Sequence, residues 1–130
     1  MKLIAHRGNI DGPDPSKENN PDYIEQAISQ GFDVEIDLRY SSLDKNLYLG
    51  HDEPTYKINW FWLGNYKDYL WIHCKNIDAL FELSKTDMHI FFHNVDDVTL
   101  TSKKYIWTFP GKKLTNNSIC VLPEQSKCII

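Results

Sequence analysis

The sequence lacks the features that mark nucleic-acid-binding, membrane-spanning and secreted chains. It has no run of basic residues and carries a formal net charge of -4, whereas nucleic-acid binding depends on clustered Lys and Arg for phosphate contacts. No stretch of about 20 consecutive apolar residues is present, so no membrane span is predicted. The first residues, Met1 to Ile10, lack the apolar run of a signal peptide and instead indicate a strand.

Cysteine is also scarce. Cys74, Cys120 and Cys128 form neither a CxxC pair nor an even-numbered framework. We interpret them as buried or edge thiols in a reducing compartment, and we predict a cytoplasmic location. Repeats and low-complexity tracts are absent as well. The 130 residues therefore indicate one domain, residues 1–130, with one core.

Strand and helix patterns alternate along the chain. Helices are expected after the caps Asn20 and Asn76, and strand-like runs occur at residues 3–6, 32–39, 47–51, 70–75, 89–93, 105–109 and 119–122. The order strand, helix, strand indicates parallel βαβ units. A complete (β/α) barrel takes about 250 residues, roughly twice this length. We therefore predict an α/β fold that forms a small or incomplete TIM-type (β/α) barrel with parallel strands.

The strongest local signal is the run Glu35-Ile36-Asp37. Because side chains alternate along a strand, both carboxylates point to the same face. Carboxylates crowded together repel each other unless a cation lies between them, and Mg²⁺ and Ca²⁺ prefer such oxygen ligands. The alternative, which the spacing by itself leaves open, is a solvated strand face.

Histidines follow two of the expected strands. His6 closes the first, with Arg7 and Gly8 after it, and His51 closes the later hairpin arm. Imidazole titrates near neutrality and can act as acid or base, and a guanidinium can bind phosphate through two donors. Taken singly, each histidine indicates a structural or solvent-exposed residue rather than a catalytic one. Their position beside Glu35 and Asp37 favours a functional site, since ligands bind outside the carboxyl ends of parallel strands.

The order and spacing of these motifs over residues 3–52 resemble the glycerophosphodiester phosphodiesterase family, one of the phosphatidylinositol-phospholipase-like barrels. The resemblance rests on His6-Arg7-Gly8, Glu18-Asn19, Glu35-Ile36-Asp37 and His51-Asp52. It implies that His6 and His51 are the catalytic acid/base pair. It also implies that Glu35 and Asp37 hold Mg²⁺ or Ca²⁺.

The same resemblance assigns the remaining site residues. Arg7 contacts the phosphate, and Glu18 supports the site near the metal and substrate. A later strand of the family carries an acidic metal ligand followed two residues on by Lys, and Lys75 matches that Lys. His73 stands at the position of the acid, which makes it the third expected metal ligand. Imidazole is a poorer match than carboxylate for Mg²⁺ or Ca²⁺, so Mn²⁺ is a further option.

The predicted function is metal-assisted cleavage of a glycerophosphodiester or similar small phosphodiester to an alcohol and a phosphomonoester. The alternative is a phospho-ligand binding module on the same fold, with little or no catalysis because His73 replaces the acid. Expected partners are the small phosphodiester and, because an incomplete barrel has an open edge that invites pairing, a second copy of the chain. Otherwise the segment Glu124 to Ile130 is expected to cover that edge.

Overall fold

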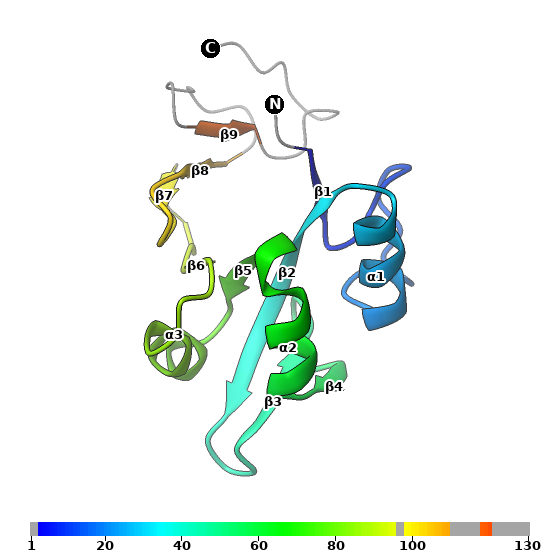
Figure 1. Cartoon of the computed structure of the whole chain (residues 1–130). Helices are drawn as coiled ribbons and strands as arrows, with labels where there is room; N and C mark the ends of the chain where they lie inside the picture. Colours follow the sequence, from blue (N-terminus) through cyan, green and yellow to red (C-terminus); the bar gives the residue numbers. More distant parts are fainter. Residues whose placement is uncertain (1–2, 96–97, 110–117, 121–130) are drawn as a thin grey trace.

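The computed structural model describes residues 3–95, 98–109 and 118–120. Six strands form one mixed sheet in the order β4-β3-β2-β5-β6, with β1 paired to β2 beside this path, and three more form a small sheet in the order β7-β8-β9. Figure 1 shows the two sheets and the helices. The bounds are β1 Ile4–His6, α1 Pro21–Ser29, β2 Asp33–Ser41, β3 Asn46–Leu49, β4 Tyr56–Ile58, α2 Trp60–Tyr66, the 3-10 helix η1 Lys67–Tyr69, β5 Leu70–Cys74, α3 Ile77–Ser84, β6 Ile90–Phe91, β7 Val98–Leu100, β8 Ile106–Thr108 and β9 Ser118–Cys120.

The predicted barrel is wrong. In the part of the chain that the structure describes, the main sheet is open and is accompanied by a separate three-stranded sheet and three α-helices. The parallel ladder β1-β2-β5-β6 does form, as the βαβ pattern indicated. It does not continue, because β8 pairs antiparallel with β7 and parallel with β9 instead of with β6. On the other side, β3 and β4 extend the sheet as antiparallel strands.

Strand β2 organises the main sheet. Its first residues pair in parallel with β1 and its last residues pair antiparallel with β3, while β5 runs parallel along its other edge. In Figure 1, β2 is the long strand around which the helices are arranged. One side of β2 is apolar and fully buried, and it belongs to a single core with side chains from all three helices: Val34, Ile36, Leu38, Ile24, Ala27, Leu63, Ala79 and Leu83.

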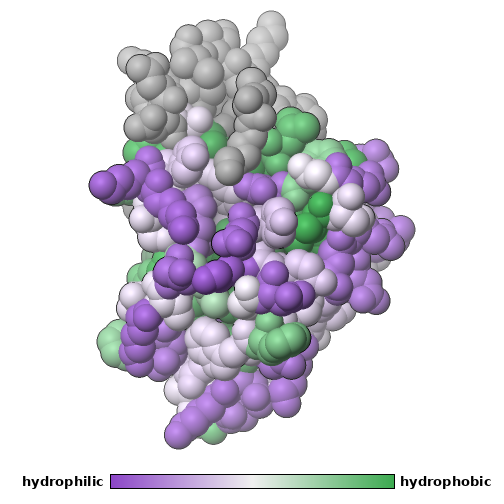
Figure 2. All heavy atoms as spheres, in the orientation of Figure 1, coloured by the Kyte–Doolittle hydropathy of each residue, from purple (hydrophilic) through white to green (hydrophobic). Residues whose placement is uncertain are grey.

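Local sequence explains where the helices begin. Asn20 and Asn76 each accept a backbone hydrogen bond at the N-terminus of a helix, and Pro21 occupies the first turn of α1. Asn59 caps α2 in the same way, with its side chain accepting from the backbone nitrogen of Trp62. No helix in the described part of the chain is both long enough and apolar enough to cross a membrane. The view in Figure 2 is mostly hydrophilic, with hydrophobic side chains in small separate groups.

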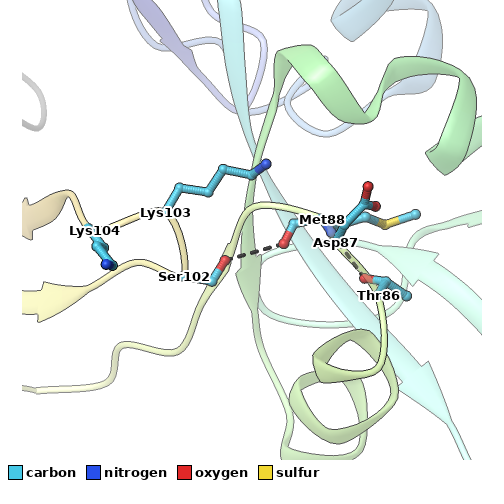
Figure 3. Close-up of a pocket in the computed structure, with 6 residues that line it drawn as sticks. All are labelled: Thr86, Asp87, Met88, Ser102, Lys103 and Lys104. Carbon is cyan, nitrogen blue, oxygen red and sulfur yellow. Dashed lines mark hydrogen bonds between the residues drawn. The ribbon is translucent and has the colours of Figure 1, made fainter.

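A second, aromatic core covers the other face of the main sheet. It consists of Trp71, Phe91 and Trp107, and the Phe91 and Trp107 rings are stacked with centroids 4.7 Å apart. Hydrogen bonds also join the two sheets beside the pocket drawn in Figure 3, where the Ser102 hydroxyl donates to the Met88 carbonyl. None of the predicted site residues lines that pocket.

Candidate functional site

Strand pairing gathers the predicted residues at one end of the sheet. His6 lies opposite Glu35 in the β1–β2 register, and His73 lies opposite Asp37 in the β2–β5 register. Partners in register point to the same face, so all four side chains share the face opposite the helix-covered core. The Nε2 atom of His6 lies 3.7 Å from Oε1 of Glu35.

Both carboxylates are buried and lie close to one imidazole. Glu35 and Asp37 are each 1% exposed. The Nδ1 atom of His73 lies 3.7 Å from Oε2 of Glu35 and 3.5 Å from Oδ1 of Asp37. One donor atom from each of the three residues falls within 4.8 Å of the others. This donor set has the composition of a divalent-cation site, since carboxylate and imidazole are both common metal ligands.

The two oxygens of Asp37 have different surroundings. Oδ2 accepts a 2.9 Å hydrogen bond from Asn19 and lies 3.1 Å from Nε of Arg7, while Oδ1 faces His73. Burial raises the pKa of Asp37, but the contacts from His51 and Asn19 and the charge of Arg7 outweigh it and hold that pKa well below its ordinary value. Asp37 is therefore ionised at neutral pH, with Oδ1 directed toward the three-residue cluster.

Arg7 contacts three of the predicted site residues. It has a left-handed backbone, with φ of 57°, directly after β1. Its guanidinium contacts Glu18 through Nη1 at 3.0 Å, Asp37 through Nε at 3.1 Å and His51 through Nη2 at 2.7 Å. These contacts hold three of the predicted residues together. Phosphate binding by Arg7 stays a prediction, and a phosphate would have to share or displace these partners.

His51 lies at the rim, and the loop after β3 holds it there. The loop begins at Gly50, whose nitrogen donates to the Asp37 carbonyl at 3.0 Å, and Arg39 donates to the carbonyls of both Gly50 and His51. The His51 side chain is 39% exposed, and its Nδ1 lies 3.6 Å from Oδ2 of Asp37. Because a guanidinium can only donate, the shorter contact from Arg7 makes Nδ1 an acceptor and leaves the proton of neutral His51 on Nε2.

Glu18 supports the opposite side of Arg7. Its Oε2 accepts hydrogen bonds from the side chain of Asn9 at 3.0 Å and from the backbone of Asp14 at 3.1 Å. Burial raises the pKa of Glu18, but the hydrogen bonds from Asn9 and Arg7 outweigh it, and the pKa is lowered. Glu18 thus orders the 9–18 loop and fixes Arg7. Its expected role near the metal and substrate stays a prediction.

Lys75 is the predicted residue that the structure does not connect to the others. It follows the last residue of β5, and its backbone nitrogen donates to the Leu38 carbonyl at 2.8 Å. In the described part of the chain, no hydrogen bond or ion pair is formed by its half-buried side chain. Its role in substrate binding therefore stays a prediction.

Three residues that the sequence interpretation did not assign help to build the site. Asn19, 2% exposed and with φ of 64°, pairs with Asp37 twice, donating to its carboxylate and accepting from its backbone nitrogen at 3.0 Å. Arg39 and Gly50 shape the loop that carries His51. The sequence could have pointed to Asn19 and Arg39 as site residues. Asn19 is adjacent to Glu18, and Arg39 shares the strand face of Glu35 and Asp37.

The guanidinium of Arg7 contacts the carboxylates of Glu18 and Asp37, whereas Glu35 lies beside the imidazoles of His6 and His73. When these histidines are neutral, the ion pairs of the described residues leave the buried Glu35 carboxylate without a cationic partner. In addition, Oε1 of Glu35 is buried without a hydrogen-bond partner in the part of the chain that the structure describes. A buried carboxylate oxygen is costly to leave unpaired, so a bound cation fits this site. Comparison of the chain with protein-family models, curated proteins and solved structures finds no match.

Proposed function

We propose that this protein is a metal-assisted phosphodiesterase that cleaves a glycerophosphodiester or a similar small phosphodiester to an alcohol and a phosphomonoester. The observation that carries the proposal is the convergence of two buried carboxylates and three histidines at one end of a parallel ladder. Histidines can carry out general acid–base chemistry, and carboxylates can hold a divalent cation. The cluster contains both kinds of group.

Glu35, Asp37 and His73 are the residues that would hold the cation. When bound, a divalent ion would neutralise charge on the phosphodiester and polarise the attacking hydroxyl. The protein's own residues orient the rest of the site. Asn19 holds Oδ2 of Asp37, which directs Oδ1 toward the cluster, and Glu18 holds Arg7 at its edge.

Arg7 couples substrate binding to the state of His51. With Arg7 on Nδ1, the neutral imidazole carries its proton on Nε2 and cannot accept another proton there. When a phosphodiester oxygen takes over Nη2 of Arg7, the ring proton of His51 exchanges through solvent from Nε2 to Nδ1, and a small ring rotation closes the 3.6 Å gap to Asp37. Nε2 then has a free lone pair at the rim. His51 becomes competent as a base only when an anionic substrate is present.

His51 then removes the proton from the attacking hydroxyl, which belongs to water or to the substrate itself. His6 protonates the oxygen of the leaving alcohol. His6 lies at the end of β1 with its Nε2 3.7 Å from Glu35, whereas His51 lies beside Asp37. With one histidine by each carboxylate, different side chains serve the entering and leaving oxygens, as in-line displacement at phosphorus requires.

The test is a screen of glycerophosphodiesters with Mg²⁺, Ca²⁺ and Mn²⁺, run on wild type, Glu35→Gln and Glu82→Gln. Glu35→Gln keeps the shape of the side chain and removes its charge. Glu82→Gln makes the same change on α3, where Glu82 pairs with Lys85. We expect metal-dependent turnover by wild type and Glu82→Gln and its loss in Glu35→Gln. Equal turnover by all three proteins, or none by wild type with any ion, contradicts the proposal.

One observation favours a second candidate, a phospho-ligand binding module. Arg7 lies 3.1 Å from Asp37 and already offsets part of the carboxylate charge without a metal. A module of this kind would bind a phosphodiester through Arg7 and release it unchanged. Calorimetry with the same phosphodiesters separates the two candidates: metal-independent binding without product, lost in Arg7→Met, supports the binding module.

A further inference from the structure

We propose that the cluster of Glu35, Asp37 and His73 selects a first-row transition-metal ion, from Mn²⁺ to Zn²⁺, over Mg²⁺ and Ca²⁺. The inference rests on the proposed function, because it names the class of ion at the same site. His73 determines which class of metal ion binds, and it can act as a ligand because its tautomer is fixed.

A backbone carbonyl fixes the tautomer of His73. Nε2 of His73 lies 2.9 Å from the carbonyl oxygen of His93. A carbonyl oxygen can only accept, so Nε2 carries the proton and Nδ1 of the neutral ring has a lone pair. That lone pair faces Oε2 of Glu35 and Oδ1 of Asp37. Metal-bound histidines commonly donate their other ring nitrogen to a carbonyl or carboxylate in this way.

Packing fixes the orientation of the same ring. Phe91 stacks on His73 with ring centroids 4.8 Å apart and an angle of 20° between the planes. The side chain of His73 is 12% exposed. A ring flip would lose the hydrogen bond to the His93 carbonyl and leave a buried N–H without its acceptor, which is unfavourable. Nδ1 is therefore held toward the carboxylates.

In the neutral ring with this tautomer, three electron-pair donors face one another. The distances of 3.5 and 3.7 Å from Nδ1 to the carboxylate oxygens are too long for ordinary N–H···O hydrogen bonds. A cation placed among Nδ1 of His73, Oε2 of Glu35 and Oδ1 of Asp37 satisfies all three donors together. The other oxygen of Glu35, Oε1, is buried without a hydrogen-bond partner among the described residues and lies 3.7 Å from Nε2 of His6. Imidazole nitrogen favours transition ions, whereas Mg²⁺ and Ca²⁺ favour all-oxygen sites, so one nitrogen and two carboxylates select the former.

The experiment measures metal binding directly, without turnover. Mn²⁺ is titrated into the full chain and followed by electron paramagnetic resonance, with Mg²⁺, Ca²⁺ and Zn²⁺ as competitors. Electron spin-echo envelope modulation then reports whether a nitrogen is bound to Mn²⁺. His73→Gln retains a donor for the His93 carbonyl and removes the ligand nitrogen. His89→Gln is the matched control, because His89 is buried beside Thr101 in the aromatic core and not in the cluster.

We expect one nitrogen on Mn²⁺ in wild type and His89→Gln, and none in His73→Gln. His73→Glu should lower the preference for Mn²⁺ over Mg²⁺ on the order of tenfold, as an all-carboxylate site would. The inference is overturned by absence of Mn²⁺ binding in wild type, by nitrogen modulation that persists in His73→Gln, or by displacement of Mn²⁺ with equimolar Mg²⁺ or Ca²⁺.

These results are separable from those that test the proposed function. A protein that binds Mn²⁺ through His73 but cleaves no phosphodiester upholds the inference and refutes the proposed activity. A protein that cleaves phosphodiesters with Mg²⁺ or Ca²⁺ and shows no bound nitrogen upholds the activity and refutes the inference.

Discussion

Replacing Asn19 with Ala should destabilise the protein more than any other single amide removal near the site. Asn19 is 2% exposed, and its amide donates to the Asp37 carboxylate at 2.9 Å and accepts from the Asp37 backbone nitrogen at 3.0 Å. Asn19→Ala leaves a buried carboxylate oxygen and a buried N–H each short of one partner. The substitution also puts a Cβ-bearing residue without a polar side chain at φ of 64°.

The magnitude follows from these three losses. A hydrogen bond to a charged group is worth about 1.5–3 kcal/mol, and an orphaned buried N–H costs about 1–3 kcal/mol. The left-handed backbone costs an L-residue such as Ala about 1–2 kcal/mol, and Asn, which tolerates this conformation better, already incurs part of that cost. The terms overlap, because the site relaxes and water enters, so we expect a fall of about 3–5 kcal/mol in the free energy of unfolding. That is a large share of the roughly 5–15 kcal/mol typical of a domain.

Asn19→Gly separates the backbone term from the hydrogen bonds. Glycine adopts φ of 64° without strain, so Asn19→Gly should be about 1 kcal/mol less destabilising than Asn19→Ala. The assay is urea unfolding of both variants and wild type, followed by tryptophan fluorescence at pH 7. A loss of under 1 kcal/mol in Asn19→Ala, or equal losses in the two variants, would refute the reasoning.

Three further predictions concern the histidines, the loop and pH. His6→Ala and His51→Ala should each lower kcat by about 10²–10⁴-fold on a substrate that wild type cleaves, with unchanged far-UV circular dichroism; near-full activity in both would make them structural. Gly50→Ala should lower Tm, because the new Cβ would lie 1.9 Å from a backbone carbonyl oxygen, whereas Gly64→Ala has no atom within 4 Å and should raise Tm slightly. The folded-state pKa of Asp37 is lowered, so as the pH falls the unfolded chain takes up the proton first. The stabilisation that ionised Asp37 gives the folded state is complete above the unfolded-state pKa of about 3.9 and is lost as the pH drops from there toward the folded-state pKa. Urea unfolding midpoints measured between pH 7 and pH 3 should therefore fall less steeply in Asp37→Asn than in wild type.

Much of the candidate site could be predicted from short sequence patterns. Glu35 and Asp37 share a strand face because side chains alternate, and His6 and His73 join them because parallel strands align their carboxyl ends. The contact between Arg7 and His51 spans 44 residues and could not be predicted, because it depends on a left-handed turn after β1 and on the loop after β3.

The fold was harder to predict than the site. Helix α2 lies in a stretch of aromatic residues without clear periodicity, and it forms because Asn59 caps it and Leu63 is buried against the sheet. The barrel prediction was wrong because βαβ order determines the direction of strands but not the number that join one sheet. The segment expected to cover the open edge, Glu124 to Ile130, lies outside the described residues, and self-association stays a prediction.

The sequence by itself determined the local directions of side chains: which residues lie on the polar side of β2, where helices begin, and that polar groups follow the parallel strands. These properties depend on residues only a few positions apart in the sequence, so hydrophobic periodicity and capping residues are enough to predict them. Only the tertiary structure decided that Asn19 and Arg7 hold Asp37, that the His93 carbonyl sets the tautomer of His73, and that the sheet stays open. These properties depend on register and turn geometry between distant segments, where packing free energy across the whole chain outweighs local preference.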